Sequence, residues 1–168
     1  MKGNRSQGHL PLIGVGPLIV VPQILATALG IAVSQSGAVD IARTPLLQIP
    51  FCIAGFLLIA FAVYLWVRAN FGSRIDDRIR HNELVTDGVY GIVRNPIYSA
   101  FFLACTGAIL FADNLLLLVL PALFWAYMTL ALRTTEEKCL SNLYGEEYRE
   151  YCRHVNRCIP SLCHCCRS

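Results

Sequence analysis

The residues from Leu84 to Tyr98 concentrate side chains that could bind a ligand, directly before an apolar run. Tyr90 and Tyr98 offer aromatic faces that suit a cation or a purine. Asn95 and Pro96 form a typical helix start, in which asparagine accepts a backbone N–H bond and proline leaves no donor unpaired. Arg94 adds a full charge to the free donors of that start, which favours a carboxylate or phosphate. Polar groups at a lipid boundary are costly, so this segment predicts a functional site; the structural alternative is a basic loop with interfacial tyrosines.

A second polar segment follows the last apolar run. Thr134 and Glu137 have the spacing of a capping box, so Glu137 could simply cap a cytosolic helix instead of binding a ligand. This structural explanation does not apply to Glu136. A carboxylate here could bind ribose hydroxyls or an amino group of a cofactor, if the segment folds back onto the Arg94 loop. The apolar and aromatic residues beyond it approximate the spacing of an amphipathic helix that lies on the cytosolic face of a membrane bundle. These are Leu140, Leu143, Tyr144, Tyr148 and Tyr151.

The elements that must position these residues are apolar helices. The 168 residues are 55% apolar and 15% charged, too apolar for an ordinary soluble domain. The runs 10–33 and 46–67 reach the roughly 20 residues that cross a bilayer, and the runs 97–112 and 115–132 fit a tight hairpin. We therefore expect an all-α, polytopic membrane bundle with about four transmembrane helices and a C-terminal cytosolic amphipathic helix. A buried hairpin of a soluble protein is the alternative for the shorter runs, and a secretory signal is the alternative for the first.

Basic residues set the expected orientation. Thirteen of the 14 lysines and arginines precede the first run, lie between the second and third, or follow the fourth; only Arg43 falls elsewhere. This bias places both termini and the site in the cytoplasm, and it attributes the net charge of +3 to topology and membrane lipids rather than to nucleic acid. We expect one integral-membrane domain over residues 1–168, with the motifs in 84–160 and a flexible tail at 161–168.

The eight cysteines predict no metal site. Those of the tail lie in a reducing compartment if the topology is right, so disulfides are not expected. The run from Cys163 to Cys166 lacks the usual spacing of zinc ligands, and zinc or palmitoylation remain alternatives for it.

The motifs, taken together, resemble those of the integral-membrane methyltransferases of the isoprenylcysteine carboxyl methyltransferase and phospholipid methyltransferase superfamily. The resemblance covers about half of the chain, from Leu84 to Pro160. Its elements are the segment Leu84 to Tyr90, the run Arg94 to Tyr98, the pair Glu136-Glu137 with Leu140, the residues Tyr144, Gly145, Tyr148 and Tyr151, and the closing Ile159-Pro160.

The resemblance implies S-adenosylmethionine as methyl donor, S-adenosylhomocysteine as product, and a lipophilic acceptor that enters from the bilayer. It implies catalytic roles for Arg94, Asn95, Glu136 and Glu137. The implied cofactor-binding residues are Val89, Tyr90, Arg94, Asn95, Pro96, Tyr98, Glu136 and Glu137. An isoprenylcysteine carboxylate or a similar amphiphile is the expected acceptor.

The chain departs from this family at Asn95, where many members carry histidine. Asparagine cannot titrate near neutral pH, which removes any proton transfer at that position. A carboxylate acceptor needs no general base, whereas an amine does, and His81 and Glu83 are the nearby candidates. Phospholipid or amine N-methylation and a non-catalytic membrane scaffold are the alternative functions. The sequence does not fix the oligomeric state.

Overall fold

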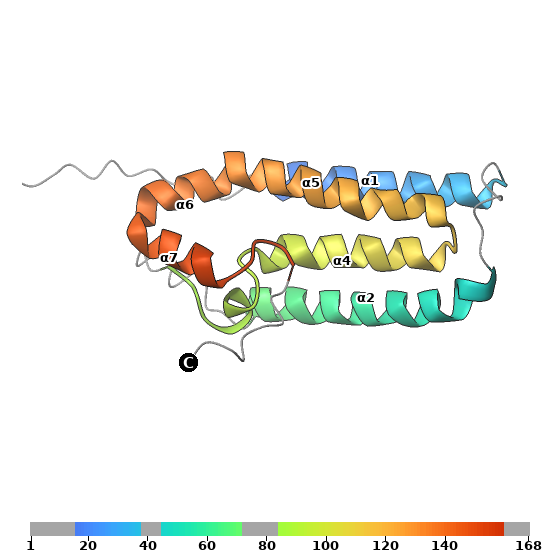
Figure 1. Cartoon of the computed structure of the whole chain (residues 1–168), viewed down its shortest axis with the longest axis horizontal. Helices are drawn as coiled ribbons and strands as arrows, with labels where there is room; N and C mark the ends of the chain where they lie inside the picture. The colour runs from blue at the N-terminus through green and yellow to red at the C-terminus, as the bar shows by residue number, and fades with distance from the viewer. Residues whose placement is uncertain (1–15, 38–44, 72–83, 160–168) are drawn as a thin grey trace, which may run out of the picture.

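The protein is an antiparallel helix bundle with a helical cap at one end (Figure 1). The computed structural model describes residues 16–37, 45–71 and 84–159. Within these ranges there is no strand, which agrees with the all-α expectation. The helices are α1 (Gly16–Gln35), α2 (Gln48–Phe71), α4 (Pro96–Phe111), α5 (Val119–Thr134), α6 (Glu136–Tyr144) and α7 (Glu146–His154), with short 3-10 turns η2 (Pro45–Leu47), η3 (Gly88–Gly91) and η4 (Leu115–Leu118).

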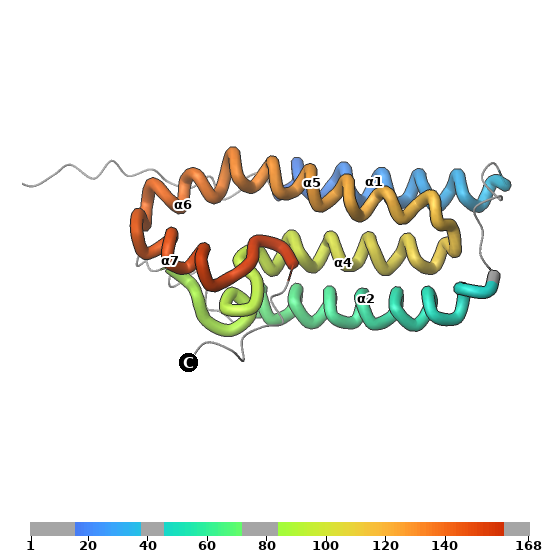
Figure 2. Tube along the Cα trace, viewed as in Figure 1, coloured from blue at the N-terminus to red at the C-terminus, as the bar shows by residue number. Residues whose placement is uncertain are grey.

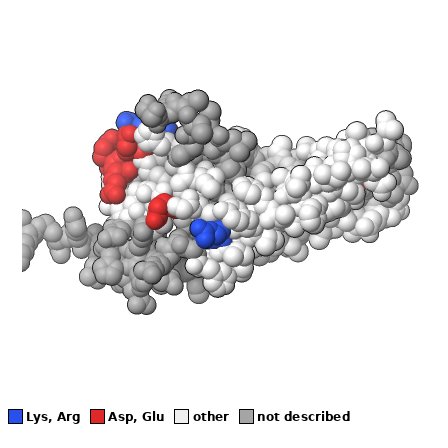
Figure 3. Space-filling model, turned by 90° about the horizontal axis from the view of Figure 1, so that it is seen from below, with Lys and Arg blue, Asp and Glu red and all other residues white. Residues whose placement is uncertain are grey.

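The apolar runs of the sequence correspond to the four long helices. α1, α2 and the run Leu115–Tyr144 are each long and apolar enough to cross a membrane, whereas α4 is a shorter apolar helix of 16 residues. Large apolar side chains are exposed along α1, α2 and α5, such as Leu25, Phe56 and Leu130. Figure 3 shows the same pattern, with a long surface free of charge and charged residues only toward the end that carries α6 and α7. The protein is therefore an integral membrane protein. Residues 10–15 of the first expected run lie outside the described residues.

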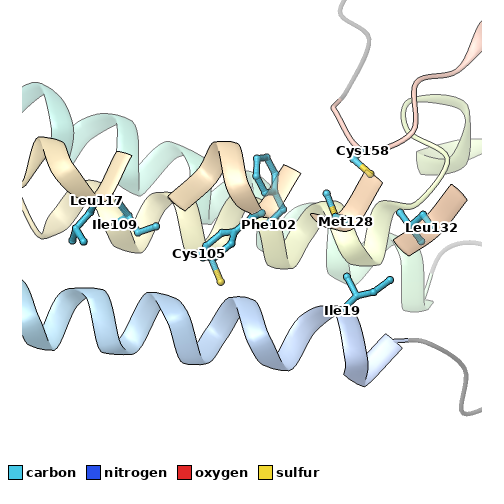
Figure 4. Close-up of a cluster of buried hydrophobic side chains, with 9 residues drawn as sticks. Ile19, Phe102, Cys105, Ile109, Leu117, Met128, Leu132 and Cys158 are labelled. Carbon is cyan, nitrogen blue, oxygen red and sulfur yellow. The ribbon is translucent and has the colours of Figure 1, made fainter. Parts of the chain in front are cut away.

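Helix α4 is the centre of the bundle, because it contacts α1, α2 and α5 (Figure 2). A cluster of buried side chains joins α4 to α1 and α5; Figure 4 draws Ile19, Phe102, Cys105 and Met128 among its members. On the other side, α4 approaches α2 through two glycines. A Cβ atom at Gly107 would lie 2.7 Å from the carbonyl oxygen of Gly55, so neither position has room for a side chain. Small residues permit such close helix contacts in membranes.

The far end of the bundle, opposite the cap, is closed by neutral hydrogen bonds. Asn114 precedes η4 and is 2% exposed. Its side-chain oxygen accepts from the backbone N–H of Leu116 at 3.0 Å, and its amide donates to the hydroxyl of Ser34 in α1 at 3.1 Å. One side chain thus both starts the last membrane helix and attaches it to the first.

The cap consists of two short helices rather than one continuous amphipathic helix. Gly145 separates them with φ +58°, a conformation that glycine adopts without steric cost. Tyr148 and Tyr151 of α7 are buried as the sequence pattern predicts, with ring centroids 6.2 Å apart. Leu143 does not follow that pattern, since it is 47% exposed. The turn at Gly145 lets α7 run back toward the start of α4 (Figure 1).

Candidate functional site

Residues far apart in the sequence meet at the start of α4. The backbone N–H groups of Arg94 and Asn95 donate to the carbonyl oxygens of Asn156 and Arg157, at 2.9 and 3.1 Å. These two bonds hold the segment after α7 against the segment before α4. The predicted fold-back of the tail onto the Arg94 loop is therefore present in the structure.

Asn95 occupies the expected position before Pro96, but its side chain does not cap the helix. Its amide nitrogen donates instead to the carbonyl oxygen of Arg157 at 3.2 Å, and its own carbonyl accepts from the backbone N–H and hydroxyl of Ser99. The capping prediction was wrong because a partner 62 residues away engages the side chain. Asn95 thus connects the helix start to the tail.

Glu137 is the centre of a partly buried charge cluster. Arg157 donates to both of its carboxylate oxygens, from Nε at 2.5 Å and from the terminal NH2 nitrogen at 2.7 Å. A terminal nitrogen of Arg94 lies 3.3 Å from the same carboxylate. The side chains of Arg94 and Glu137 are only 9% and 12% exposed, so neither could lose its partner without a large desolvation penalty. The hydrogen bond with Glu137 raises the pKa of Arg157, so its charge is retained.

The capping box suggested by Thr134 and Glu137 does not form. Thr134 donates to carbonyl oxygens one turn earlier in α5, and α6 begins after Thr135 with no side-chain cap. The carboxylate of Glu137 pairs with Arg94 and Arg157 instead. Its alternative as a simple helix cap is thereby excluded by the structure.

Glu136 faces the two tyrosines of the predicted site. The hydroxyl of Tyr98 donates to Glu136, and the charge of Glu136 also acts on Tyr90. Burial, together with that charge, raises the pKa of Tyr90 to about 12. The Tyr90 phenol therefore stays protonated and can donate a hydrogen bond at neutral pH.

Helix α7 closes this side of the site. The hydroxyl of Tyr151 donates to the carbonyl oxygen of Tyr90 at 2.5 Å. Burial raises the pKa of Tyr151, so its phenol also remains a donor. The sulfur of Cys152 accepts from Arg94, which places this half-buried thiol beside the charge cluster.

Comparisons with known proteins identify the family. The profile of the phospholipid methyltransferase family matches residues 50–147, more than half of the chain. The chain belongs to this family. The matched range contains the Arg94 loop, α4, α5 and the two glutamates, but it ends before Arg157.

The curated relatives that match are methyltransferases by name, with one exception among those found, a metal-resistance protein. A protein-S-isoprenylcysteine O-methyltransferase of Schizosaccharomyces pombe is 34% identical over 51% of this chain and 36% of its own length. Protein-S-isoprenylcysteine O-methyltransferase B of Arabidopsis thaliana is 30% identical over 49% of this chain and 42% of its own length. A methanethiol S-methyltransferase of Bradyrhizobium diazoefficiens is 35% identical over 43% of this chain and 24% of its own length. The chain spans less than half the length of these relatives, and no solved structure matches it.

The structure gathers most of the predicted site residues in one place. Arg94, Asn95, Tyr98, Glu136 and Glu137 are joined by the contacts above. Tyr90 lies beside them: its backbone carbonyl accepts from Tyr151, and the charge of Glu136 acts on its phenol. Two others have a packing role.

Val89 and Pro96 are buried, and Val89 packs in a cluster with residues of α2. Both shape the turn that presents Arg94, and neither offers a polar side chain to a ligand.

Two residues that belong to the charge cluster, Arg157 and Cys152, were not identified from the sequence. Arg157 was counted only as a topological charge, and no local spacing links it to Glu137, 20 residues earlier. Its position two residues before the Ile159-Pro160 motif was the available signal. His81, Glu83 and the cysteines from Cys163 to Cys166 lie outside the described residues. Among the residues that are described, no three metal-binding side chains converge.

Proposed function

We propose that this protein transfers a methyl group from S-adenosylmethionine to a lipophilic acceptor at the cytosolic boundary of a membrane. One observation carries the proposal: in a chain of the phospholipid methyltransferase family, Glu136 and Glu137 meet Arg94 and Tyr98 at the start of the central helix. These are two motifs about 40 residues apart, and they form one polar cluster beside apolar helices.

The polar groups of the cluster fit such a cofactor. S-adenosylmethionine has a cationic sulfonium and ammonium, a carboxylate and two ribose hydroxyls. Glu136 supplies a carboxylate for a cation or a hydroxyl pair, and the rings of Tyr90 and Tyr98 beside it suit a sulfonium. The Nε of Arg94 is buried without a hydrogen-bond partner among the described residues, so the cluster retains a cationic donor for a carboxylate. When bound, the sulfonium supplies an electrophilic methyl group.

The chain's own residues then have positioning and electrostatic roles. Arg94 anchors an acidic group, Glu136 orients the polar end of the cofactor, and Asn95 holds the helix start against the tail. Arg157 keeps Glu137 and Arg94 in place. Methyl transfer is an in-line displacement, which depends chiefly on holding the two reactants in line and excluding water. No proton transfer by Asn95 is required for a carboxylate acceptor.

We favour an isoprenylcysteine carboxylate as the acceptor, because relatives at 34% and 30% identity carry that name. The acceptor would enter from the bilayer, since the site lies at the end of lipid-facing helices. A cytoplasmic cap and site are part of this proposal: the described basic residues lie at the cap end of their helices or in the cap, and the positive-inside rule favours the cytoplasm for such an end.

Phospholipid amine N-methylation is a second candidate. The family model that matches the chain favours it, because that family is named for phospholipid methylation. Asn95 does not favour it, because an amine acceptor must lose a proton and none of the described residues of the cluster is a histidine.

Calorimetric titration of the detergent-purified protein with S-adenosylhomocysteine tests the proposal. We expect saturable binding that Glu136→Ala and Arg94→Ala weaken at least tenfold, and that Glu146→Ala leaves unchanged because Glu146 is an exposed residue of α7. Absence of binding to the unsubstituted protein would contradict methyl transfer and favour a scaffold. Transfer of a labelled methyl group to a prenylcysteine analogue or to phosphatidylethanolamine then decides between the two acceptors.

A further inference from the structure

An open cavity lies where α5, α6 and α7 meet; Glu137, Tyr148 and Cys152 line part of it, whereas Glu136, Tyr90 and Tyr98 do not. It has a volume of about 420 Å³, and three cationic side chains line it, one from each helix: Arg133, Lys138 and Arg149. Ser141 and Asn142 add a hydroxyl and an amide to the same wall. This set of donors and charges suits an anion with several oxygens.

The acidic residues nearby do not neutralise the three cations. Glu137 also lines the cavity, but Arg94 and Arg157 already pair with its carboxylate. Glu146 pairs with Arg149 at 3.2 Å, and both side chains are at least two-thirds exposed, so water screens this pair. No ion pair of Arg133 or Lys138 is found among the described residues. The cavity therefore keeps a positive charge.

The position of the cavity favours a lipid over a soluble anion. Arg133 lies in the last turn of α5, three residues after Leu130, which is 64% exposed. Leu123, seven residues before Leu130 and on the same helix face, is 56% exposed. A lipid-facing apolar stripe thus leads directly to the cationic cavity. Acyl chains can lie along the stripe while the headgroup reaches Arg133 and Lys138.

We propose that this cavity binds the phosphate headgroup of one anionic phospholipid, which joins the end of α5 to the two cap helices. Such a lipid would hold α6, with Glu136 and Glu137, at the membrane surface. The binding itself does not depend on the proposed methyl transfer, so either can fail without the other.

The test measures retained lipid on the full-length protein. The protein is extracted from nanodiscs of phosphatidylcholine with a minor fraction of phosphatidylglycerol, and native mass spectrometry counts the phosphatidylglycerol molecules that stay bound. The variant Arg133→Gln/Lys138→Gln removes two cavity charges. The matched control, Arg68→Gln/Arg153→Gln, removes two exposed charges of the same end that do not line the cavity.

We expect one phosphatidylglycerol on the unsubstituted protein and on the control, and about a 25-fold weaker retention by the cavity variant, at roughly fivefold per cation. All substitutions are at exposed positions, and unchanged thermal unfolding verifies that each variant is folded. Equal loss in both variants would overturn the proposal, because it would show only general attraction to an anionic surface. Displacement of the lipid by inorganic phosphate at comparable concentration would also overturn it, because the cavity would then bind free phosphate.

Discussion

Two asparagines precede helices at opposite ends of this bundle, and they are used differently. At the far end, Asn114 caps η4 and bonds to Ser34, so its hydrogen bonds join two membrane helices. At the cap end, Asn95 leaves its helix uncapped and bonds to the backbone of Arg157. Asn114 therefore stabilises the packing of the bundle, whereas Asn95 stabilises the contact between the start of α4 and the tail.

The two ends also differ in charge. The far end is joined by a neutral pair, for which burial is inexpensive once both groups are bonded. The cap end depends on Glu137 and two arginines, whose burial is tolerated only while all three remain together. We therefore predict that the charged end can lose its order while the membrane helices stay packed, which would suit a site that admits the proposed cofactor and acceptor.

The substitution Glu137→Gln should have the largest effect. It removes the only carboxylate paired with Arg94 and Arg157 in the described structure, and it should destabilise the cap by about 3 kcal/mol. Hydrogen exchange should increase in α6 and α7 and remain unchanged in α1 and α2. Glu146→Gln, at an exposed pair, is the control and should change stability by less than about 0.5 kcal/mol. If Glu137→Gln increased hydrogen exchange in α1 and α2 as much as in α6 and α7, the two ends of the bundle would not be independent.

Asn114→Ala should affect the opposite end by about 1–2 kcal/mol. It removes both the helix cap and the bond to Ser34. Thermal unfolding in detergent measures the loss, and Ser34→Ala should reproduce only part of it. If the ends act separately, binding of S-adenosylhomocysteine should not change; a tenfold loss of binding would show that the ends are coupled.

Asn95→Ala should cost no more than about 1 kcal/mol, because the backbone bonds to Asn156 and Arg157 persist. Asn95→His introduces a group that titrates near pH 6.5. Methyl transfer by this variant should acquire a step in its pH profile in that range, which the unsubstituted protein lacks. An identical profile for both proteins would show that the side chain at this position does not face the reacting groups.

Tyr151→Phe should have the smallest effect at neutral pH, about 0.5–1 kcal/mol, since it removes one hydrogen bond to Tyr90. Its alkaline behaviour is more informative. Burial raises the pKa of Tyr151, while an unfolded tyrosine titrates near 10, so the folded state holds the proton and loses stability as the pH rises above 10. Unfolding experiments between pH 9 and 11 should show a shallower decline for the variant. An unchanged slope would indicate that Tyr151 is not buried against the Tyr90 loop.

Much of this architecture was predictable because it depends on local pattern. Apolar runs located the membrane helices to within a few residues, and the run Arg94 to Tyr98 with Glu136 and Glu137 indicated which polar side chains would gather at the start of α4. The contacts that decide side-chain roles are not local. Asn95 fits the helix-cap rule, and Glu137 fits the capping-box rule, but both side chains are engaged by Arg157. A residue so distant in sequence cannot be paired with them by spacing.

The division of the tail at Gly145 illustrates the same limit. The spacing of Leu140, Tyr144, Tyr148 and Tyr151 is close to that of one helix, so periodicity alone favours a continuous element. The positive φ of Gly145 breaks that helix and reverses its direction. The burial of α7 against the Tyr90 loop and the bonds of Asn156 and Arg157 to the Arg94 loop favour the reversal.

The backbone bonds between residues 94–95 and residues 156–157 have a consequence for how the protein is made. During translation, the described apolar helices α1, α2, α4 and α5 emerge before the segment that completes the cluster, so we expect lipid insertion to precede closure of the site. A newly inserted chain that stops after α5 would have its hydrophobic packing but no partner for Arg94. The proposed catalytic cluster would therefore be completed late, after the apolar helices have entered the membrane.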